Sequence, residues 1–525
     1  MSVERALAAA CGDLTIDDRK ALERTLNAYL SGGDARCRDV VGLVAAGNNG
    51  EAAQLAFSIA SDAEANLDPS DPAHAETRQI AAARWRDAAV VAALIETDFA
   101  MTAAERATDF DPTNAELWNY VGVYRYRVGA IADAEEAFSN ALQIADDESF
   151  QAGVALTNIA MVASQKAEFV KAGEFARRAL LIFERTESDD EKVRALEIAG
   201  TAARQRGEVD DAEEMLRRAL LLAEQRGLDV EETVVLTELG DIAYGRGDLS
   251  TAEAFYLRSL AIEVRLGRKD GEATVMGNLG LVAKARDDLD TAKSYFKGAV
   301  VIFEALSDES AVAINLHNLG LVETTRANYD DAEVLFNRAL QINERLGLKK
   351  RQAAQLGALG VIAWHRRNLS TAHRFHSQSL AIAEELGELE AQAIALHNLG
   401  DVAGGRAQFD SAELFFLRAL AINEKLGRKS GQANNLGKLG LLARIAEDLD
   451  VSRDFHMRAI ELHHQVGSKL GIAAELFNLG LVAAELGDLS AQCRYWSQSK
   501  ELYFHMKIMH EVDDIDRQMR AAGCT

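Results

Sequence analysis

The sequence predicts an all-α protein in which antiparallel helix pairs stack into a solenoid. At 525 residues the chain is longer than one hydrophobic core can serve. Apolar residues make up 48% of it and aromatic residues only 6%, and its 3 prolines, Pro69, Pro72 and Pro112, all lie in the first quarter. This composition favours Ala- and Leu-rich helices over strands joined by turns.

A repeat with a period of 40 residues runs through most of the chain. A Leu-Gly pair recurs at that spacing, with its glycine at Gly240, Gly280, Gly320, Gly360, Gly400, Gly440 and Gly480. Most units have a small residue twelve positions later, as at Ala252, and a bulky ring sixteen positions later, as at Phe336, with His376 and His456 replacing the ring in two units. Each unit is therefore interpreted as two helices that cross where the residues are small.

The helix boundaries of one unit follow from its turn residues. Thr233 to Arg246 and Ser250 to Leu266 are predicted to be the two helices. Gly247 and Asp248 then form the turn between them, and Gly267 caps the second helix.

The pattern resembles the tetratricopeptide repeat. The Trp, Leu, Gly, Ala, Phe and Ala positions of that family are clearest at Trp118, Val121, Gly122, Ala134, Phe138 and Ala141. Two positions depart from it, since the family's tyrosine falls on Arg125 and its closing proline on Asp146. The long unit is similar to those of kinesin light chains and G-protein-signalling modulators. The resemblance implies a right-handed superhelix and a peptide-binding adaptor.

The array is expected to occupy residues 73–506, with about eleven units. Residues 1–70 are predicted to be a helical cap, possibly a degenerate repeat, and residues 507–525 a capping tail. The run Asp68-Pro69-Ser70-Asp71-Pro72 marks the boundary after the cap.

The resemblance also implies that the first helix of each unit lines the concave surface, with the residue two before the glycine position facing the groove. Five units have asparagine there, at Asn158, Asn278, Asn318, Asn398 and Asn478. An amide side chain can both donate to and accept from the backbone of an extended peptide. The alternative is that these asparagines bond to neighbouring helices and stabilise the superhelix.

Basic and aromatic residues are predicted to complete this peptide-binding surface. They are His317, His397, Lys284, Arg444, Trp364 and Tyr244, together with Arg204. Such a lining favours a peptide with acidic and apolar side chains. The alternative is that they are ordinary solvated side chains.

An arginine ladder stands at the end of the first helix in six successive units. Its members are Arg206, Arg246, Arg286, Arg326, Arg366 and Arg406. We expect a structural role, because a cation at a helix C-terminus is favoured by the helix dipole and can bond to the last carbonyls. An anion-binding stripe is the alternative.

Composition and missing motifs argue against several functions. A formal charge of -25 disfavours nucleic acid and anionic membranes, and no apolar run is long enough to cross a bilayer. No phosphate loop, HExxH or GxSxG motif is present, so no enzyme activity and no cofactor are predicted. The histidines of the ring position are not expected to bind metal. The four cysteines are scattered, which predicts neither a zinc site nor a disulfide and suits a cytoplasmic location.

Taken together, these features predict a non-enzymatic scaffold or adaptor that binds an extended peptide or helix of another protein. The alternative function is a ligand-responsive regulatory subunit or signalling receptor that controls a separate enzyme. Self-association through the convex surface is a third possibility.

Overall fold

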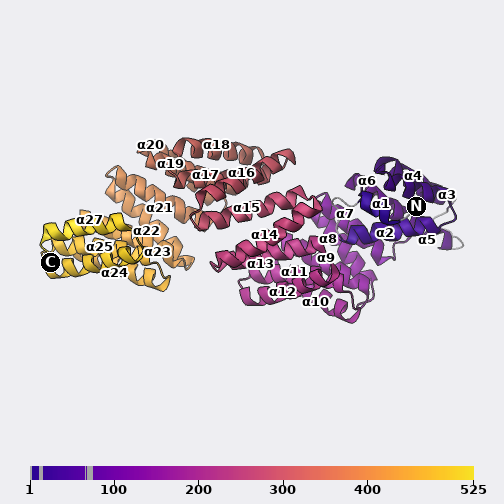
Figure 1. The fold of residues 1–525 in the computed structure, drawn as a ribbon, viewed down its shortest axis with the longest axis horizontal. Helices are drawn as coiled ribbons and strands as arrows, with labels where there is room; N and C mark the ends of the chain where they lie inside the picture. The colour runs from indigo at the N-terminus through magenta and orange to yellow at the C-terminus, as the bar shows by residue number, and fades with distance from the viewer. Residues whose placement is uncertain (1–2, 11–15, 66, 68–74, 525) are drawn as a thin grey trace. The chain divides into compact units, whose positions relative to one another are not determined.

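The computed structural model describes residues 3–10, 16–65, 67 and 75–524. Within these ranges the regular structure is entirely α-helical, as predicted (Figure 1). The predicted boundary at Asp68 to Pro72 lies outside the described residues. The chain divides into two compact units, Met1–Ile302 and Phe303–Thr525. None of the described helices is both long enough and apolar enough to cross a lipid bilayer.

The first unit begins with four helices and continues as successive helix pairs. The four are α1 (Val3–Ala10), α2 (Ile16–Ser31), α3 (Ala35–Ala45) and α4 (Asn49–Glu64). The pairs are α5 (Ala75–Ala92) and α6 (Thr97–Phe110), α7 (Ala115–Arg127) and α8 (Ile131–Ile144), α9 (Phe150–Gln165) and α10 (Phe169–Arg185), α11 (Asp189–Gln205) and α12 (Val209–Arg226), α13 (Asp229–Gly245) and α14 (Leu249–Leu266), and α15 (Lys269–Ala285) and α16 (Leu289–Ala305). The last of these crosses the boundary between the units.

The second unit continues the same pairing and ends with one additional helix. Its pairs are α17 (Glu309–Thr325) and α18 (Tyr329–Arg345), α19 (Lys349–His365) and α20 (Leu369–Glu385), α21 (Leu389–Gly405) and α22 (Phe409–Lys425), α23 (Lys429–Ile445) and α24 (Leu449–Gln465), and α25 (Lys469–Glu485) and α26 (Leu489–His505). The helix α27 (Met509–Ala522) follows. In both units each helix packs mainly against its neighbours in sequence, which is the arrangement of a solenoid.

Each pair is joined by a tight turn that ends one helix and starts the next. After α13, Gly247 adopts a left-handed backbone with φ of 78° and donates its N–H to the carbonyl of Tyr244. Asp248 then caps α14, because its side chain accepts the N–H of Thr251 at 3.1 Å. The predicted turn and the Gly267 cap are therefore confirmed, although α13 begins four residues before the predicted Thr233.

The repeated glycine lies under the repeated ring. A Cβ atom placed on Gly400 would stand 2.5 Å from Cε1 of Phe416, and one on Gly320 would stand 2.7 Å from Cε1 of Phe336. Ala412 and Ala332, the small residues of the second helices, are fully buried. The helices of a pair therefore approach closely only because the first helix has no side chain beneath the ring.

Replacement of Gly400 by alanine should destabilise the second unit by roughly 1–3 kcal/mol, because the new methyl group overlaps the Phe416 ring. Gly404→Ala on the same helix is the matched control. A Cβ atom there meets nothing within 4 Å, so that variant should be neutral or gain up to about 1 kcal/mol from helix propensity. Urea unfolding followed by circular dichroism measures both, and equal midpoints for the two variants would contradict the packing argument.

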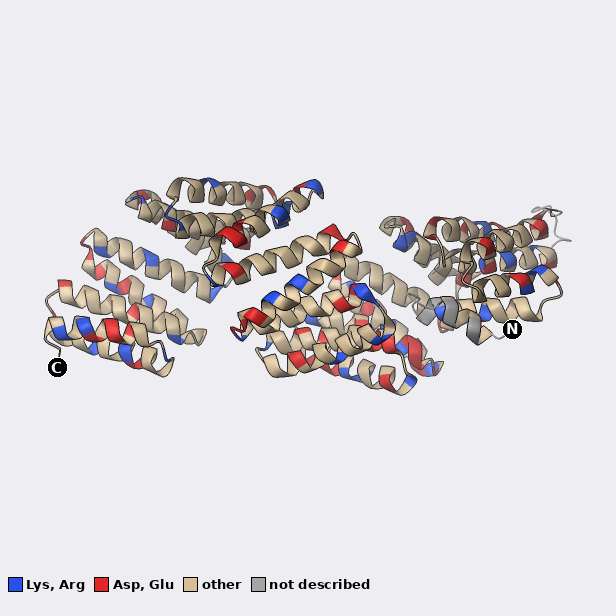
Figure 2. Cartoon of the chain, turned by 45° about the horizontal axis from the view of Figure 1, so that its top comes forward, with Lys and Arg blue, Asp and Glu red and all other residues tan. Residues whose placement is uncertain are grey.

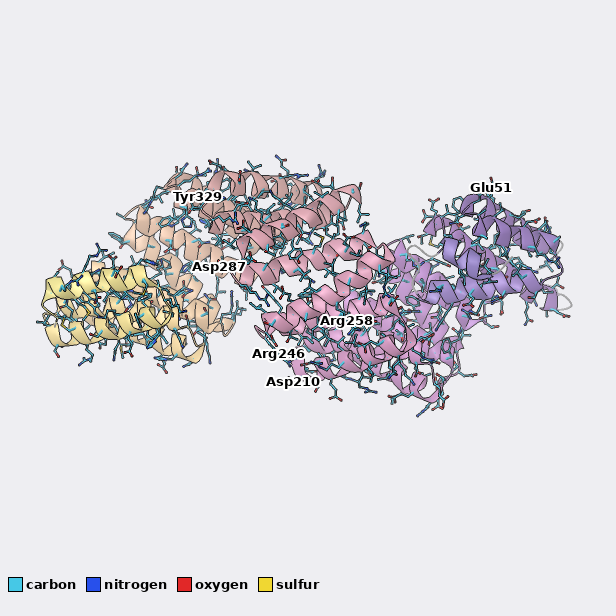
Figure 3. All side chains as sticks on the ribbon, in the orientation of Figure 1. Glu51, Asp210, Arg246, Arg258, Asp287 and Tyr329 are labelled. Carbon is cyan, nitrogen blue, oxygen red and sulfur yellow. A yellow bond between two sulfur atoms is a disulfide. The ribbon has the colours of Figure 1, made fainter. Side chains whose placement is uncertain are left out.

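The arginine ladder joins each repeat to the one before it. Arg246 at the end of α13 binds Asp210 near the start of α12 at 2.6 Å and also binds Glu213 (Figure 3). Arg286 repeats this with Glu253 at 2.6 Å and with the carbonyl of Leu249, and Arg366 binds Asp330 and Glu333. The structural role is therefore supported, but the bonds of Arg246, Arg286 and Arg366 run to the second helix of the preceding repeat rather than to the arginine's own helix end, whereas Arg206 also pairs with Glu208 just after its own helix. Acidic and basic residues are interspersed on the helices of both units (Figure 2).

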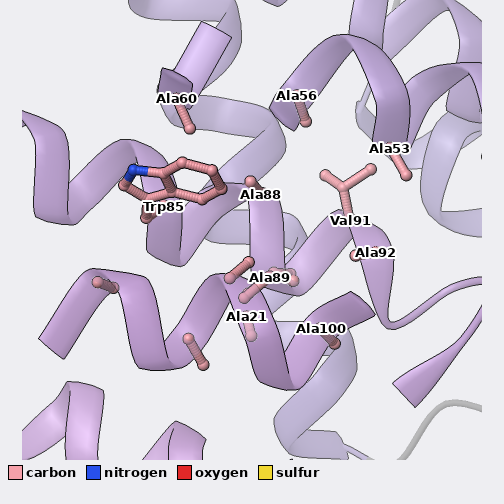
Figure 4. Close-up of a cluster of buried hydrophobic side chains, with 14 of the residues drawn as sticks. Ala21, Ala53, Ala56, Ala60, Trp85, Ala88, Ala89, Val91, Ala92 and Ala100 are labelled. Carbon is pink, nitrogen blue, oxygen red and sulfur yellow. The ribbon is translucent and has the colours of Figure 1, made fainter. Parts of the chain in front are cut away.

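The N-terminal helices share one alanine-rich core with the first pairs. Trp85 and Ala88 on α5 lie against Ala56 and Ala60 on α4, and Ala21 of α2 reaches the same cluster (Figure 4). The ring of Phe57 meets Trp85 edge-on, with 5.4 Å between ring centres. Since small side chains let the helices approach closely, α2 is a fixed part of this core.

The C-terminal helix α27 folds back on α26. It buries Val512, Ile515 and Met519 against Trp496 and Tyr503. A disulfide joins Cys493 on α26 to Cys524, with 5.4 Å between their Cα atoms. The expectation that no cysteines pair is therefore wrong: the turn before α27 brings together two residues that are 31 positions apart, which their spacing alone does not reveal.

Candidate functional site

The first helices of the repeats form the inner side of each curved unit. In the first unit α7 contacts α9, α9 contacts α11, and α11 contacts α13. In the second unit α17, α19 and α21 make a similar series, and α23 contacts α25. In the described part of the chain no comparable contact joins consecutive second helices. Because the first helices are more closely spaced, they line the concave face.

The five predicted asparagines all lie on first helices. Asn158 on α9 is buried, with 1% exposure. The other four, Asn278 on α15, Asn318 on α17, Asn398 on α21 and Asn478 on α25, are half-buried. They do not form one unbroken ladder, since intervening repeats have Ile198, Glu238, Ala358 and Lys438 at the same position.

These amides are not used to hold the helices together. Among the described residues, no hydrogen bond joins the side chain of Asn278, Asn318, Asn398 or Asn478 to another residue. The buried Oδ1 of Asn158 also has no partner within the described ranges. The alternative in which the asparagines stabilise the superhelix through side-chain hydrogen bonds is therefore not supported.

The predicted aromatic residues and histidines pack against their own repeat or the following one. The ring of His317 lies 5.4 Å from that of Phe336, and Trp364 packs beside Ala372 and Val402. Tyr244 lies in the core between α13 and α15. His397 packs on Phe416, and its Nδ1 lies 2.7 Å from Oδ1 of Asn435. These side chains are therefore ordered by the fold.

The predicted cations are partly neutralised by neighbouring carboxylates. Arg444 binds Glu485 at 2.7 Å, and Arg204 binds Glu238 at 2.9 Å. Lys284 is half-buried, and burial lowers the pKa of its ammonium group. Two inner-face residues absent from the sequence prediction, Asp401 and Lys438, pair at 2.8 Å.

A cavity of about 930 Å³ lies in the first unit, between α2 and the inner faces of α7, α9, α11 and α13. Of the predicted site residues it contains only Asn158. Asn119, Tyr120, Arg194 and Glu197 also line it and were not predicted. The sequence offers no signal for this cavity, because one wall comes from α2, which lies far from the repeats in sequence.

Burial perturbs one carboxyl group of this cavity. Glu197 on α11 is half-buried at the cavity wall, and burial raises its pKa to about 7. Arg194, one turn away, opposes this shift, whereas Glu238 and Glu231 reinforce it. A cation arriving beside Glu197 would favour its charged form. As to metals, the described ranges hold no group of three His, Cys, Asp or Glu residues suited to an ion.

The stacked helix pairs and their common inner face define a helical repeat solenoid. A sequence model described as "Tetratricopeptide repeat" matches residues 231–305, 271–345 and 350–425. Residues 231–345 and 350–425 therefore carry tetratricopeptide repeats. No curated protein matches the chain.

Solved structures share this fold at low sequence identity. RapI in its apo form is 14% identical, covers 68% of this chain and 98% of its own, and gives a TM-score of 0.54. The apo quorum sensor NprR from B. thuringiensis is 13% identical, covers 65% of this chain and 98% of its own, and gives 0.50. BtubC (BKLC) from P. vanneervenii is 23% identical. It covers 43% of this chain and 92% of its own, and it gives a TM-score of 0.37. The first two show the fold alone.

Proposed function

We propose that this protein is a non-enzymatic scaffold that binds a segment of another protein along the inner face of its repeats. The observation that carries this proposal is the set of inner-face amides that no described residue satisfies, at Asn278, Asn318, Asn398 and Asn478. Each can bond to the backbone of an extended peptide for about 1 kcal/mol net. Side chains such as Trp364 and His397, which are held by contacts with their own and the following repeat, add shaped contacts.

The triple variant Asn278→Ala, Asn318→Ala and Asn398→Ala should lose capture of the partner while folding as the wild type does. Three lost hydrogen bonds weaken binding by roughly a hundredfold. Affinity capture from the native organism, quantified by mass spectrometry for wild type and variant side by side, measures this loss. The free energy of unfolding, measured by thermal melting, should stay within about 0.5 kcal/mol of the wild-type value.

Asn337→Ala is the matched control, because Asn337 is exposed on the second helix α18. It should capture the same proteins as the wild type. If the triple variant does not fold, the asparagines are needed for the stability of the fold. A folded triple variant with full capture would exclude the inner face as the binding surface.

A second candidate function is a ligand-responsive regulatory subunit. The cavity beside α2 favours it, since its volume suits a short peptide or a small molecule. The structural neighbour NprR is described as a quorum sensor. A small molecule that raises the melting temperature, with no peptide competing, would support this function. The cytoplasmic location, the absence of nucleic-acid partners and self-association stay predictions.

A further inference from the structure

The helix α2 is a fixed wall of the cavity in the first unit. Its side chains Leu22, Leu26 and Tyr29 are buried in the N-terminal core. Its opposite face presents Lys20, Glu23, Arg24 and Asn27 to the cavity. Since the buried face anchors the helix, the cavity does not depend on a loose segment.

Ion pairs join this wall to the repeats. Lys20 binds Asp190 at 2.6 Å and Glu191 at 3.1 Å at the start of α11. Arg24 binds Glu116 at 3.1 Å and donates to the hydroxyl of Tyr120 at 3.3 Å on α7. The inner face of these repeats thus already receives two basic side chains that stand one helical turn apart.

Two buried amides leave acceptors unsatisfied at the cavity. Asn119 and Asn158 are 5% and 1% exposed, and both line the cavity. The Nδ2 group of Asn119 donates to Oε1 of Gln151 at 3.2 Å. Among the described residues the Oδ1 atom of each asparagine has no partner. A buried acceptor without a partner is unfavourable, so a ligand that donates N–H groups here relieves that penalty.

The repeat side of the cavity carries an excess of negative charge. Its charged residues are the carboxylates Glu116, Glu187, Asp189, Asp190, Glu191, Glu197 and Glu231 and the guanidinium groups Arg127, Arg194 and Arg226. Arg226 is engaged by Asp189 at 3.1 Å. Glu197 and Glu231 share the nearby Arg194. Two carboxylates beside one guanidinium group attract a further cation.

Apolar side chains separate the polar groups. Val123, Phe150, Val154, Met161 and Val234 line the same cavity. These surfaces suit the aliphatic stem of a long basic side chain, which packs its methylene groups on apolar neighbours and keeps its charged head at the carboxylates.

We propose that this cavity binds a short peptide segment carrying a Lys or Arg side chain, whose backbone donates to Asn119 and Asn158 and whose charge lies beside Glu197 and Glu231. The inference rests on the proposed function, because it names the partner's chemistry at the N-terminal end of the inner face. It differs from the acidic peptide predicted from the sequence, since the carboxylates here outnumber the cations.

The test uses the full chain and pools of acetylated, amidated hexapeptides with one position fixed as Lys, Arg, norleucine or Glu. Binding is measured by competition against the best fluorescent peptide from these pools. Lys and Arg pools should compete, and norleucine and Glu pools should not. Affinity should fall as the pH drops from 8 to 6, because protonation of Glu197 removes a negative charge.

Three variants locate the bound peptide. The affinity for the selected Lys peptide should fall about tenfold in each of Glu197→Gln, Glu231→Gln and Asn158→Ala. The controls are Glu309→Gln and Asn337→Ala, which lie in the second unit and should bind as the wild type does. Circular dichroism checks folding, and if Glu197→Gln fails to fold, Glu231→Gln and Asn158→Ala carry the test.

Preference for the Glu pools, or unchanged affinity in all three variants, would overturn the inference. Competition by spermidine without any peptide binding would assign the cavity to a free amine instead and would also overturn it. If the triple asparagine variant loses its partner while the cavity variants bind as wild type, only the cavity inference fails. If the Lys peptide binds the cavity but the triple variant keeps its partner, only the proposed groove fails.

Discussion

Reduction of the Cys493–Cys524 disulfide should destabilise the C-terminal end of the second unit by about 4 kcal/mol. The bond closes a chain segment with a sequence separation of 31. By the chain-entropy estimate, releasing a loop of that size restores about 12 cal/mol/K to the unfolded chain. The helix α27 is then held to α26 by its apolar contacts, which include Trp496 and Tyr503, and by the ion pair of Lys500 with Asp516 at 2.9 Å.

Hydrogen exchange of α26 and α27, with and without reductant, measures this effect. Amides of both helices should exchange faster after reduction, whereas those of α17 to α19 should not change. Cys493→Ser should reproduce the reduced state and should show no further response to reductant. Equal exchange in oxidised and reduced protein would contradict the expectation that the bond stabilises this cap.

His376→Phe should stabilise the second unit in acid, by about 3 kcal/mol at pH 4. The imidazole of His376 is 1% exposed and lies on Gly360. Burial lowers its pKa to about 4, with His373 acting in the same direction and Asp401 against it. The unfolded chain binds the proton below about pH 6.5 but the folded protein does not, so the stability from this residue is complete above pH 6.5 and is lost as the pH falls towards 4.

Phenylalanine suits the site because Phe336 and Phe416 occupy the same position in the neighbouring repeats. Urea unfolding from pH 4 to pH 8 should show a smaller loss of stability for the variant than for the wild type. His505→Gln is the control, because His505 is exposed and its replacement should leave the pH dependence unchanged. Parallel curves for wild type and His376→Phe would show that this histidine does not limit acid stability.

The periodic features were predictable because they are local. Gly400 and Phe416 stand at a fixed spacing, and that spacing alone implied a close helix crossing. The turn at Gly247 follows equally from backbone conformation. The placement of Asn278 and Asn398 on first helices follows from the same register.

Contacts between repeats were not predictable in the same way. The arginine ladder was expected to bond to its own helix ends, whereas Arg246 reaches Asp210 of the preceding repeat. The partner of Arg246 depends on the rotation between successive helix pairs, and this rotation cannot be derived from the sequence of one repeat. Likewise, Asn119 carries no positional signal, because Tyr120 occupies the position two before Gly122.

The sequence by itself determined the all-α repeat, the helix pairs and the placement of the predicted asparagines on first helices, since each depends on spacing within about 40 residues. Only the tertiary structure decided the cavity beside α2 and the C-terminal disulfide. Lys20 meets Glu191 across 171 positions, and α27 returns to α26 through its own turn. Both arise where the regular stacking ends, because terminal helices must cover exposed faces and are not bound by the repeat.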